Sequence, residues 1–220
     1  MATLLNMNYI AERRLEEKER RRAEILDAAE AVTARVGWDA MTMDQVARKA
    51  RLSRALVYVY FKDKTDLMFG IGERAVVTLR QYFAEAVAKH PRGLDQLVAI
   101  GHAYVAYSRE QPVYFDVMAR CEFSSPDTSN LQPNEEACIV GGKAVREVMQ
   151  EALELGVRDG SIRPDAGDPK AVTVCLWGFT HGILQLSSAK GTMLARDGLQ
   201  PRQLLEQAML MMTRSLTNSG

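Results

Sequence analysis

The densest group of chemically active side chains lies between residues 48 and 64, where positive charge gathers. Six basic residues stand there against one acid, Asp63: Arg48, Lys49, Arg51, Arg54, Lys62 and Lys64. The whole chain of 220 residues has 28 basic and 28 acidic residues, so this excess is local. Guanidinium and ammonium groups at this density neutralise phosphates, with an attraction that weakens steeply with salt. The cluster therefore indicates a polyanionic partner.

Residues that would support catalysis or metal binding are not grouped in the sequence. Gly70, Gly72 and Ala75 spell GxGxxA, but no strand precedes them, and the dinucleotide-binding fingerprint requires one. The three histidines lack metal-ligand spacing, and there is no GxSxG motif. The three cysteines are odd in number and form no CxxC pair, which argues against a zinc site or a disulfide framework and favours a reducing compartment. We therefore expect that the protein is not an enzyme and that it binds neither a cofactor nor a metal ion.

The stretch SRALVYVYFKDK, which begins at Ser53, has to position the basic cluster. Its β-branched and aromatic residues favour a strand. A strand needs a partner, however, and no second strand-like run with hairpin turn signals lies nearby. In a helix, Val57 and Phe61 lie one turn apart and face inward, while Arg54 and Tyr58 share the outer face. We therefore predict a short helix with Ser53 as its N-cap.

A second short helix is predicted immediately before this one. Thr42 and Gln45 have the spacing of a capping box, which opens a helix that ends near Ala50. Asp63 is a favourable N-cap for a third, longer helix that runs to about Lys89. Two short helices joined by a tight turn form a helix-turn-helix.

The segment from Arg21 to Met68 resembles the DNA-binding domain of the tetracycline-repressor (TetR) family of transcriptional regulators. The shared pattern is an Ile-Leu-x-Ala-Ala helix, the Gly37-Trp38 pair, a threonine cap before the helix-turn-helix and an aromatic-Phe-x-x-Lys close. A match over this length is more specific than a short motif. It implies an all-α fold, with a three-helix DNA-binding domain over residues 1–64 and a helical ligand-binding and dimerisation domain over residues 65–220. Residues 1–12 are expected to be flexible.

The resemblance also implies which residues contact DNA. Arg54 begins the recognition helix, where an arginine can read guanine O6 and N7 in the major groove. The methyl group of Ala55 can touch a thymine methyl. The full set of expected DNA-binding residues is Thr42, Arg54, Ala55, Tyr58, Tyr60 and Lys64.

Three positions depart from the family pattern, one of which is Thr33, where the first helix of the family often has Phe. The turn of the family usually contains Ala-Gly-Val-Ser, whereas this chain has Arg51 in place of the glycine. A residue other than glycine then has to adopt the left-handed conformation, with modest strain. Asp44 is an acidic residue close to a position where some relatives have a basic residue that contacts DNA.

The region after residue 65 is predicted to be entirely helical, because proline and loop signals divide it into amphipathic segments. Residues 171–189 carry no formal charge and are long enough to raise the question of a membrane span. Their threonine, histidine, glutamine and serine residues favour a buried or interface helix instead. Asp168 and Pro169 begin this helix, and Pro201 begins the last one.

The last two helices are expected to form a homodimer, because a helix that is apolar on nearly all sides has to be covered on both. The resemblance implies the same arrangement, a four-helix bundle made by two copies. Twofold symmetry then places two recognition helices about 34 to 36 Å apart, which matches a palindromic operator in double-stranded DNA.

Aromatic and sulfur-containing residues of the second domain suit a pocket for a small apolar or aromatic ligand. By the resemblance, the expected pocket residues are Tyr104, Tyr107, Phe115, Met118, Cys121, Trp177 and His181. Each has an alternative interpretation as a core residue, because aromatic residues at helical spacing usually pack in the core. His181 is the best polar contact, although a hydrogen-bonded core histidine explains it equally well.

Two functions therefore remain. The first is a cytoplasmic, homodimeric, sequence-specific DNA-binding regulator, most often a repressor in this family, that an unknown small-molecule effector releases from its operator. The alternative is an all-helical ligand-carrier or protein-interaction module that binds no specific DNA. Neither involves a membrane. Oxidation of Cys121 or Cys175 is a minor further hypothesis, which requires an exposed thiol with a lowered pKa.

Overall fold

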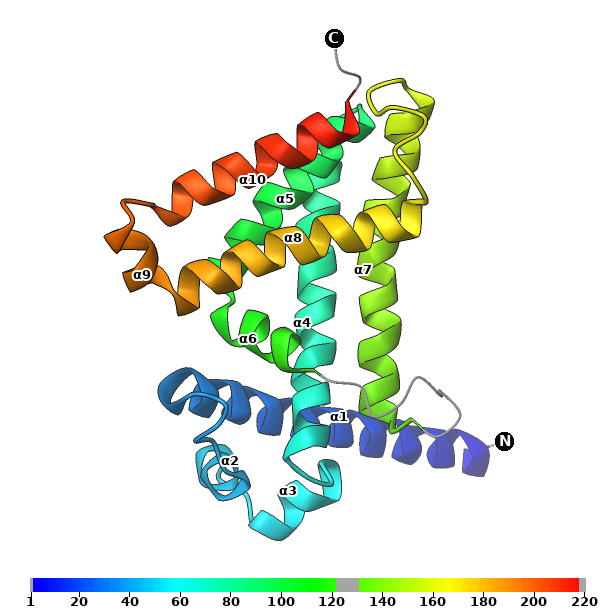
Figure 1. Ribbon diagram of the computed structural model, residues 1–220. Helices are drawn as coiled ribbons and strands as arrows, with labels where there is room; N and C mark the ends of the chain where they lie inside the picture. Colours follow the sequence, from blue (N-terminus) through cyan, green and yellow to red (C-terminus); the bar gives the residue numbers. More distant parts are fainter. Residues whose placement is uncertain (1, 122–130, 218–220) are drawn as a thin grey trace. The chain divides into compact units, whose positions relative to one another are not determined.

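The computed structural model of the protein describes residues 2–121 and 131–217 and contains, over these ranges, ten α-helices and no strand (Figure 1). The all-α prediction is therefore confirmed. The helices are α1 (Ala2–Val36), α2 (Met43–Ala50), α3 (Arg54–Tyr60), α4 (Lys64–Val87), α5 (Gly93–Glu110), α6 (Pro112–Arg120), α7 (Pro133–Arg158), α8 (Pro169–Ala189), α9 (Gly191–Arg196) and α10 (Pro201–Leu216).

The chain forms two compact units. The first consists of residues 1–74 and 116–138, and the second of residues 75–115 and 139–220. Helices α4, α6 and α7 each contribute residues to both units. The division between residues 64 and 65 that the sequence suggested falls at the first turn of α4 and stays a prediction.

The core of the first unit is formed where α1 packs on α2 and α2 packs on α3. Ile25, Leu26 and Val46 are completely buried there, together with Val57 and Phe61. These residues recur at helical spacing, so each helix places one apolar stripe inward and its charged residues outward.

The predicted starts of several helices are confirmed by their caps. Asp63 accepts a hydrogen bond from the backbone N–H of Asp66 at 2.8 Å, and Asp168 accepts one from Ala171 at 2.9 Å. Gly37 follows the end of α1 with φ of 79°. Helix α1 begins at Ala2, well before the charged run in which the sequence suggested a helix, and the short helix α9 was not predicted.

The second unit is built around α5, α8 and α10, which contact one another. Figure 1 shows α8 and α10 lying side by side across α5. At the start of α5 the backbone of Gly93 lies against that of Gly156 on α7, where a Cβ atom would be 2.0 Å from the Gly156 nitrogen. Glycine is therefore required at this close approach, which brings α5 against α7.

Helix α8 is the uncharged segment that raised the question of a membrane span. Only Thr173, Thr180 and Leu184 of this helix are buried in the single chain. Across residues 2–121 and 131–217, no helix combines the length and the apolar character that crossing a bilayer would require.

Candidate functional site

Helix α2 begins with the capping box that the sequence predicted. The backbone N–H of Gln45 donates to Thr42 Oγ1 at 3.3 Å, and the backbone N–H of Thr42 donates to Gln45 Oε1 at 2.9 Å. The reciprocal bonds satisfy donors that a helix start leaves without partners. Thr42 is thus held at the exposed amino end of α2, where the helix dipole favours an anion.

The turn between α2 and α3 contains the predicted left-handed residue, Arg51, at the position where the family usually has glycine. Arg51 has φ of 58° and ψ of 36°, and it is the one non-glycine residue with positive φ in the described chain. Its N–H donates to Arg48 O at 3.2 Å, and the N–H of Leu52 donates to Ala47 O at 3.0 Å. These bonds close α2 and turn the chain sharply into α3.

Helix α3 is a helix and not a strand. Ser53 Oγ accepts a hydrogen bond from the N–H of Leu56 at 3.2 Å. Val57, and Phe61 directly after the helix, are completely buried, whereas Arg54, Ala55, Tyr58 and Val59 are exposed. The run of β-branched and aromatic residues that favoured a strand is therefore divided between the core and an outer face.

The guanidinium of Arg54 has two partners on this outer face. Its Nε lies 3.1 Å from Asp44 Oδ1 of α2, and its Cζ lies 5.5 Å from the centre of the Tyr58 ring. A hydrogen bond to Tyr58 and the nearby charge of Asp44 raise the pKa of Arg54. The side chain is therefore fully charged and loosely held between the two helices of the motif.

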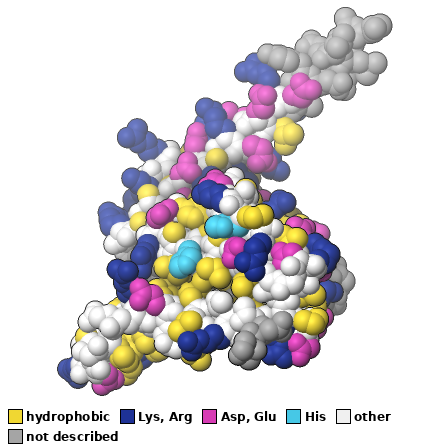
Figure 2. All heavy atoms as spheres, turned by 90° about the horizontal axis from the view of Figure 1, so that it is seen from above, with side chains coloured by type: hydrophobic (Ala, Val, Ile, Leu, Met, Phe, Trp, Pro, Cys, Tyr) yellow, Lys and Arg dark blue, Asp and Glu magenta, His cyan; other side chains and the backbone are white. Residues whose placement is uncertain are grey.

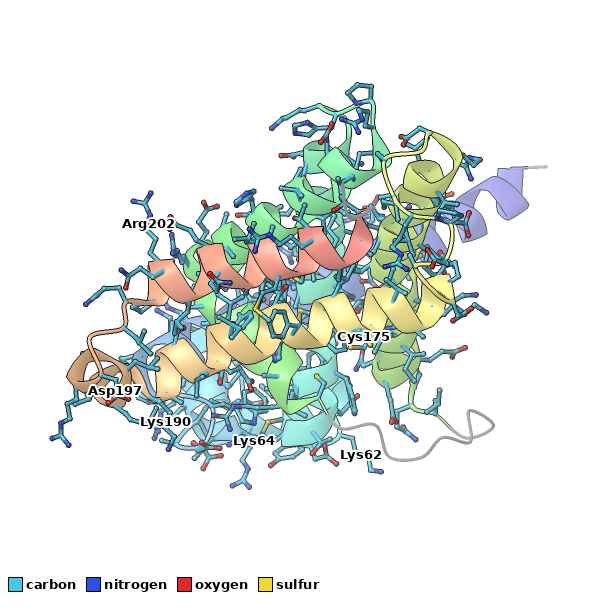
Figure 3. The ribbon with its side chains drawn as sticks, turned by 45° about the horizontal axis from the view of Figure 1, so that its top comes forward. Lys62, Lys64, Cys175, Lys190, Asp197 and Arg202 are labelled. Carbon is cyan, nitrogen blue, oxygen red and sulfur yellow. The ribbon has the colours of Figure 1, made fainter. Side chains whose placement is uncertain are left out.

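Lys64 lies at the first position of α4 and contacts the segment between α1 and α2. Its Nζ donates to Trp38 O at 2.7 Å and to Asp39 O at 3.2 Å, and it lies 5.1 Å from the centre of the Trp38 ring. The ammonium group thus joins the start of α4 to the end of the first helix. Lys62 and Lys64 are labelled in Figure 3.

Tyr60, the last residue of α3, is half-buried and lines a surface hollow with charged residues of α1. The other lining residues are Arg13, Arg14, Glu16, Glu17, Lys18 and Arg20. In the sequence, this charged run has the pattern of a solvated helix face, and no local signal connects it with Tyr60. Its high density of arginine was the signal that could have drawn attention to it.

The second unit has a hydrogen-bonded cluster of aromatic residues. Tyr104 Oη lies 2.8 Å from His181 Nδ1 and accepts a hydrogen bond from Trp177 Nε1 at 3.1 Å. Because the indole nitrogen can only donate, Tyr104 Oη is the acceptor in its bond with Trp177, and the Tyr104 hydrogen remains available for another bond. The Phe115 ring lies 5.8 Å from that of Tyr104 and 5.0 Å from that of His181.

Burial controls the ionisation of this cluster. Burial raises the pKa of Tyr104 to about 12, so the phenol remains protonated and able to donate. Burial lowers the pKa of His181 from its usual value, so the imidazole is neutral near pH 7. Tyr107 lies one turn further along α5 and is completely buried, and its hydroxyl donates to Ala75 O at 2.9 Å.

A small cavity of about 40 Å³ lies beside this cluster, between α5, α8 and α10. Tyr104 and Trp177 line it, and the other three residues that the sequence suggested in this unit do not. Met209 fills the space over Gly101, where a Cβ atom would be 2.6 Å from the methionine Cε. Met118 and Cys121 belong to the first unit, and their assignment to a ligand pocket stays a prediction.

Helices α8 and α10 expose apolar side chains in the single chain. The exposed residues are Val174, Trp177, Phe179 and Leu186 on α8, and Leu210 and Met211 on α10. Figure 3 shows Cys175 on α8, Lys190 and Asp197 at the two ends of α9, and Arg202 at the start of α10. In the space-filling view of Figure 2, hydrophobic side chains gather between charged ones.

Comparison with known proteins matches both parts of the chain. The family described as bacterial regulatory proteins, tetR family, matches residues 25–71, and the tetracyclin repressor-like C-terminal domain matches residues 97–212. The HTH-type transcriptional regulator AcrR of Shigella flexneri is 22% identical over 181 residues, which cover 80% of this chain and 82% of AcrR.

Solved structures show the same fold. A bacterial regulatory protein of the tetR family from Rhodococcus RHA1 superposes with a TM-score of 0.66 at 19% identity, covering 91% of this chain and 98% of that one. The regulator FadR from Bacillus subtilis, solved in complex with stearoyl-CoA, superposes with a TM-score of 0.65 at 15% identity, covering 88% and 98%. The matched segments, the second of which alone spans more than half of the chain, show that this protein belongs to the TetR family of helix-turn-helix transcriptional regulators, a family of DNA-binding regulators and not of enzymes.

Proposed function

We propose that the protein is a homodimeric repressor that binds a palindromic operator through α3 in the cytoplasm and leaves it when a small apolar molecule occupies the second unit. The observation that carries this proposal is the exposed face of α3. Arg54, Ala55 and Tyr58 face solvent there, while Val57 and Phe61 hold the opposite face in the core.

The DNA-binding surface combines a reading residue with groups that contact phosphates. Arg54 lies at the first turn of α3, from which side chains reach base edges when such a helix enters the major groove. Thr42 lies at the amino end of α2, where backbone N–H groups and the helix dipole favour a phosphate. The basic residues of α1 beside Tyr60 extend the positive surface, so they are proposed to add salt-dependent affinity without base selectivity.

Dimerisation is proposed to occur through α8 and α10. Both helices expose large apolar residues in the single chain, among them Phe179 and Met211. Burying such residues against a second copy removes their surface from water, at about 25 cal/mol for each Å². A twofold axis between the copies would also pair two α3 helices with two half-sites.

The effector pocket has to open before it can hold a ligand. Its volume of about 40 Å³ is far below the roughly 300 to 1,000 Å³ that ligand sites need. Met209 lies between this cavity and a second hollow of about 520 Å³ bounded by α5 and α10. Because methionine is unbranched and flexible, a rotation of this side chain would join the two spaces.

The polar contacts in the pocket indicate what the effector carries. Its lining is mostly apolar, and its polar side chains are those of Tyr104, Trp177, Thr180 and Thr213. We propose a mostly apolar effector that carries a hydrogen-bonding group. FadR from Bacillus subtilis, which has the same fold, was solved with stearoyl-CoA, whose long acyl chain and carbonyl meet this description.

The DNA-binding proposal is tested by electrophoretic mobility shift with the intergenic DNA upstream of the protein's own gene, titrated with salt and random competitor DNA. We expect saturable, selective binding by a species whose sedimentation mass is that of a dimer. Arg54→Ala should weaken binding about 5- to 150-fold and relax the preference for one base. Arg80→Ala, which removes an exposed arginine of α4, is the matched control and should bind like the wild type.

Two outcomes would contradict the proposal. Loss of all selectivity over random DNA would favour a ligand carrier or protein-interaction module. An unchanged base preference in Arg54→Ala would show that Arg54 is not a reader.

The effector proposal is tested with stearoyl-CoA as the probe. Trp177 lines the cavity, so its fluorescence in a Trp38→Phe background reports on occupancy. We expect a saturable change in emission and a parallel loss of the shifted DNA band. DNA release without a change in emission would place the effector at a site other than this cavity. If stearoyl-CoA causes neither a change in emission nor DNA release, long acyl chains are excluded as effectors.

A further inference from the structure

Two cysteine thiols meet in the first unit, outside the surfaces described above. Cys121 directly follows α6, and Cys138 lies on the second turn of α7. Both sulfurs lie over Gly72 of α4: a Cβ atom on this glycine would be 3.0 Å from Cys138 Sγ and 3.3 Å from Cys121 Sγ. The missing side chain of Gly72 therefore leaves the space in which the two thiols come together.

The two thiols are neighbours, because both sulfurs lie within 3.3 Å of the same Cβ position over Gly72. Cys138 is buried and Cys121 is half-buried, so a small reagent can reach the pair from the Cys121 side. Among the residues that the structure describes, no group of three or more histidine, cysteine or acidic side chains could hold a metal ion. The pair is thus suited to a reaction between its own sulfurs.

The ionisation of the two thiols differs in the direction that such a reaction needs. The hydrogen bond from Cys121 lowers the pKa of Cys138, although burial and the charges of Glu73 and Glu135 oppose this effect. The same hydrogen bond, together with burial, raises the pKa of Cys121. Cys138 is therefore the better thiolate, and thiolates are the attacking species in disulfide formation.

We propose that Cys121 and Cys138 are a reversible thiol–disulfide site that a hydroperoxide oxidises. The Cys138 thiolate attacks the terminal oxygen of the hydroperoxide and becomes a sulfenic acid, and the rest of the hydroperoxide leaves as the alcohol, or as water when the oxidant is hydrogen peroxide, with the proton that the Cys138 thiol had released. The Cys121 sulfur then attacks the sulfenic sulfur. The S–S bond forms as the S–O bond breaks, and the hydroxide leaves as water with the Cys121 proton. The two thiols lose two electrons in total, which reduce the O–O bond.

This site would give the regulator a second input that is independent of the effector pocket. Disulfides in a reducing compartment are usually transient and serve catalysis or sensing. A thiol carrier such as thioredoxin or glutathione would restore the dithiol by exchange. The proposal does not depend on operator binding, because it concerns only the chemistry of the two sulfurs.

The test uses the full-length reduced protein, treated with hydrogen peroxide and then denatured for thiol counting and non-reducing peptide mapping. We expect the free thiols to fall from three to one, a peptide that links Cys121 to Cys138 within one chain, and recovery with dithiothreitol. In Cys175→Ser the count should fall from two to none, because the exposed thiol on α8 (Figure 3) is not part of the pair.

Cys175 also reports whether the oxidant reached the protein. Oxidation of Cys175 while Cys121 and Cys138 stay reduced would overturn the proposal, and so would a map in which either thiol is linked to Cys175. Cys138→Ser should lose the Cys121 thiol at least about tenfold more slowly than the wild type, because the better thiolate is gone. Cys121→Ser should be oxidised at Cys138 to a sulfenic acid and form no disulfide within the chain. Equal rates would show that the sulfurs react independently.

Discussion

Arg54 Nε lies 3.1 Å from Asp44 Oδ1, so the residue best placed to read a base is paired with an acid of the preceding helix. Both side chains are more than half exposed, and an exposed ion pair of this kind is weak. Asp44 therefore leaves the Arg54 guanidinium free to move. In the proposed complex, Asp44 competes with the operator for this guanidinium and repels nearby phosphates.

Asp44→Asn should tighten operator binding. The substitution removes the competing charge and keeps the shape of the side chain, so the affinity should rise by up to about fivefold at low salt. The gain in affinity should shrink as salt increases, because salt screens both the attraction between Asp44 and Arg54 and the repulsion between Asp44 and the phosphates. Quantitative mobility shift measures it, with Glu85→Gln as a control that makes the same charge change in the second unit. Weaker binding by Asp44→Asn would show that the carboxylate helps to orient Arg54.

Arg51→Gly should stabilise the helix-turn-helix relative to Arg51→Ala. Both variants lose the same charge, but only glycine adopts φ of 58° without a clash of Cβ. Glycine relieves the strain of the left-handed conformation but is also more flexible in the unfolded chain, which offsets part of the gain. The net difference in the free energy of unfolding should be about 1 kcal/mol. Urea denaturation followed by circular dichroism measures this difference. Equal stabilities would show that the turn relaxes when arginine is replaced.

Tyr104→Phe and Tyr107→Phe form a matched pair on α5. Each removes one hydroxyl from a buried ring and leaves a partner unsatisfied, at a cost of roughly 1–3 kcal/mol in the free energy of unfolding. Only Tyr104 lines the cavity, so only Tyr104→Phe should also change effector affinity and the fluorescence of Trp177. The same change in effector affinity in both variants would indicate a general loosening of α5 and not a ligand contact.

Acid should destabilise the second unit through His181. Burial lowers the pKa of His181 in the folded protein, so the unfolded chain binds a proton more readily between the folded and the unfolded pKa values. Stability from the neutral imidazole is therefore fully present above the ordinary histidine pKa and is lost as the pH falls below it. Thermal unfolding across this range should show a steeper loss for the wild type than for His181→Gln. Parallel pH profiles would show that His181 titrates normally in the folded state.

Much of the fold could be predicted because its signals are local. Thr42, Ser53, Asp63 and Asp168 each cap a helix by accepting a hydrogen bond from a backbone N–H three residues further along the chain. The left-handed conformation of Arg51 was also predicted from a local signal, because Arg51 occupies the turn position at which the family usually has glycine. The outer face of α3 followed from its helical period, once the absence of a partner strand had excluded a sheet.

The partners of the functional side chains could not be predicted in the same way. The sequence placed Tyr104 and Tyr107 together in one pocket, yet one lines the cavity and the other donates to Ala75 O in the core. Lys64 was expected to contact DNA, which stays a prediction, and its bonds to the carbonyls of Trp38 and Asp39 had no sequence signal. These outcomes depend on how each helix is rotated against its neighbours, which residues distant in the sequence decide together.

The sequence by itself therefore determined where α2, α3, α4 and α8 begin, which face of α3 is exposed and which family the chain resembles. The first two properties depend on residues within about one helical turn of one another, and the third on the pattern from Arg21 to Met68. Only the tertiary structure decided that Arg54 meets Asp44, that the cavity between α5, α8 and α10 has a volume of about 40 Å³, and that Cys121 and Cys138 share the space over Gly72. Each of these features joins side chains of different segments, so it depends on how the helices pack against one another.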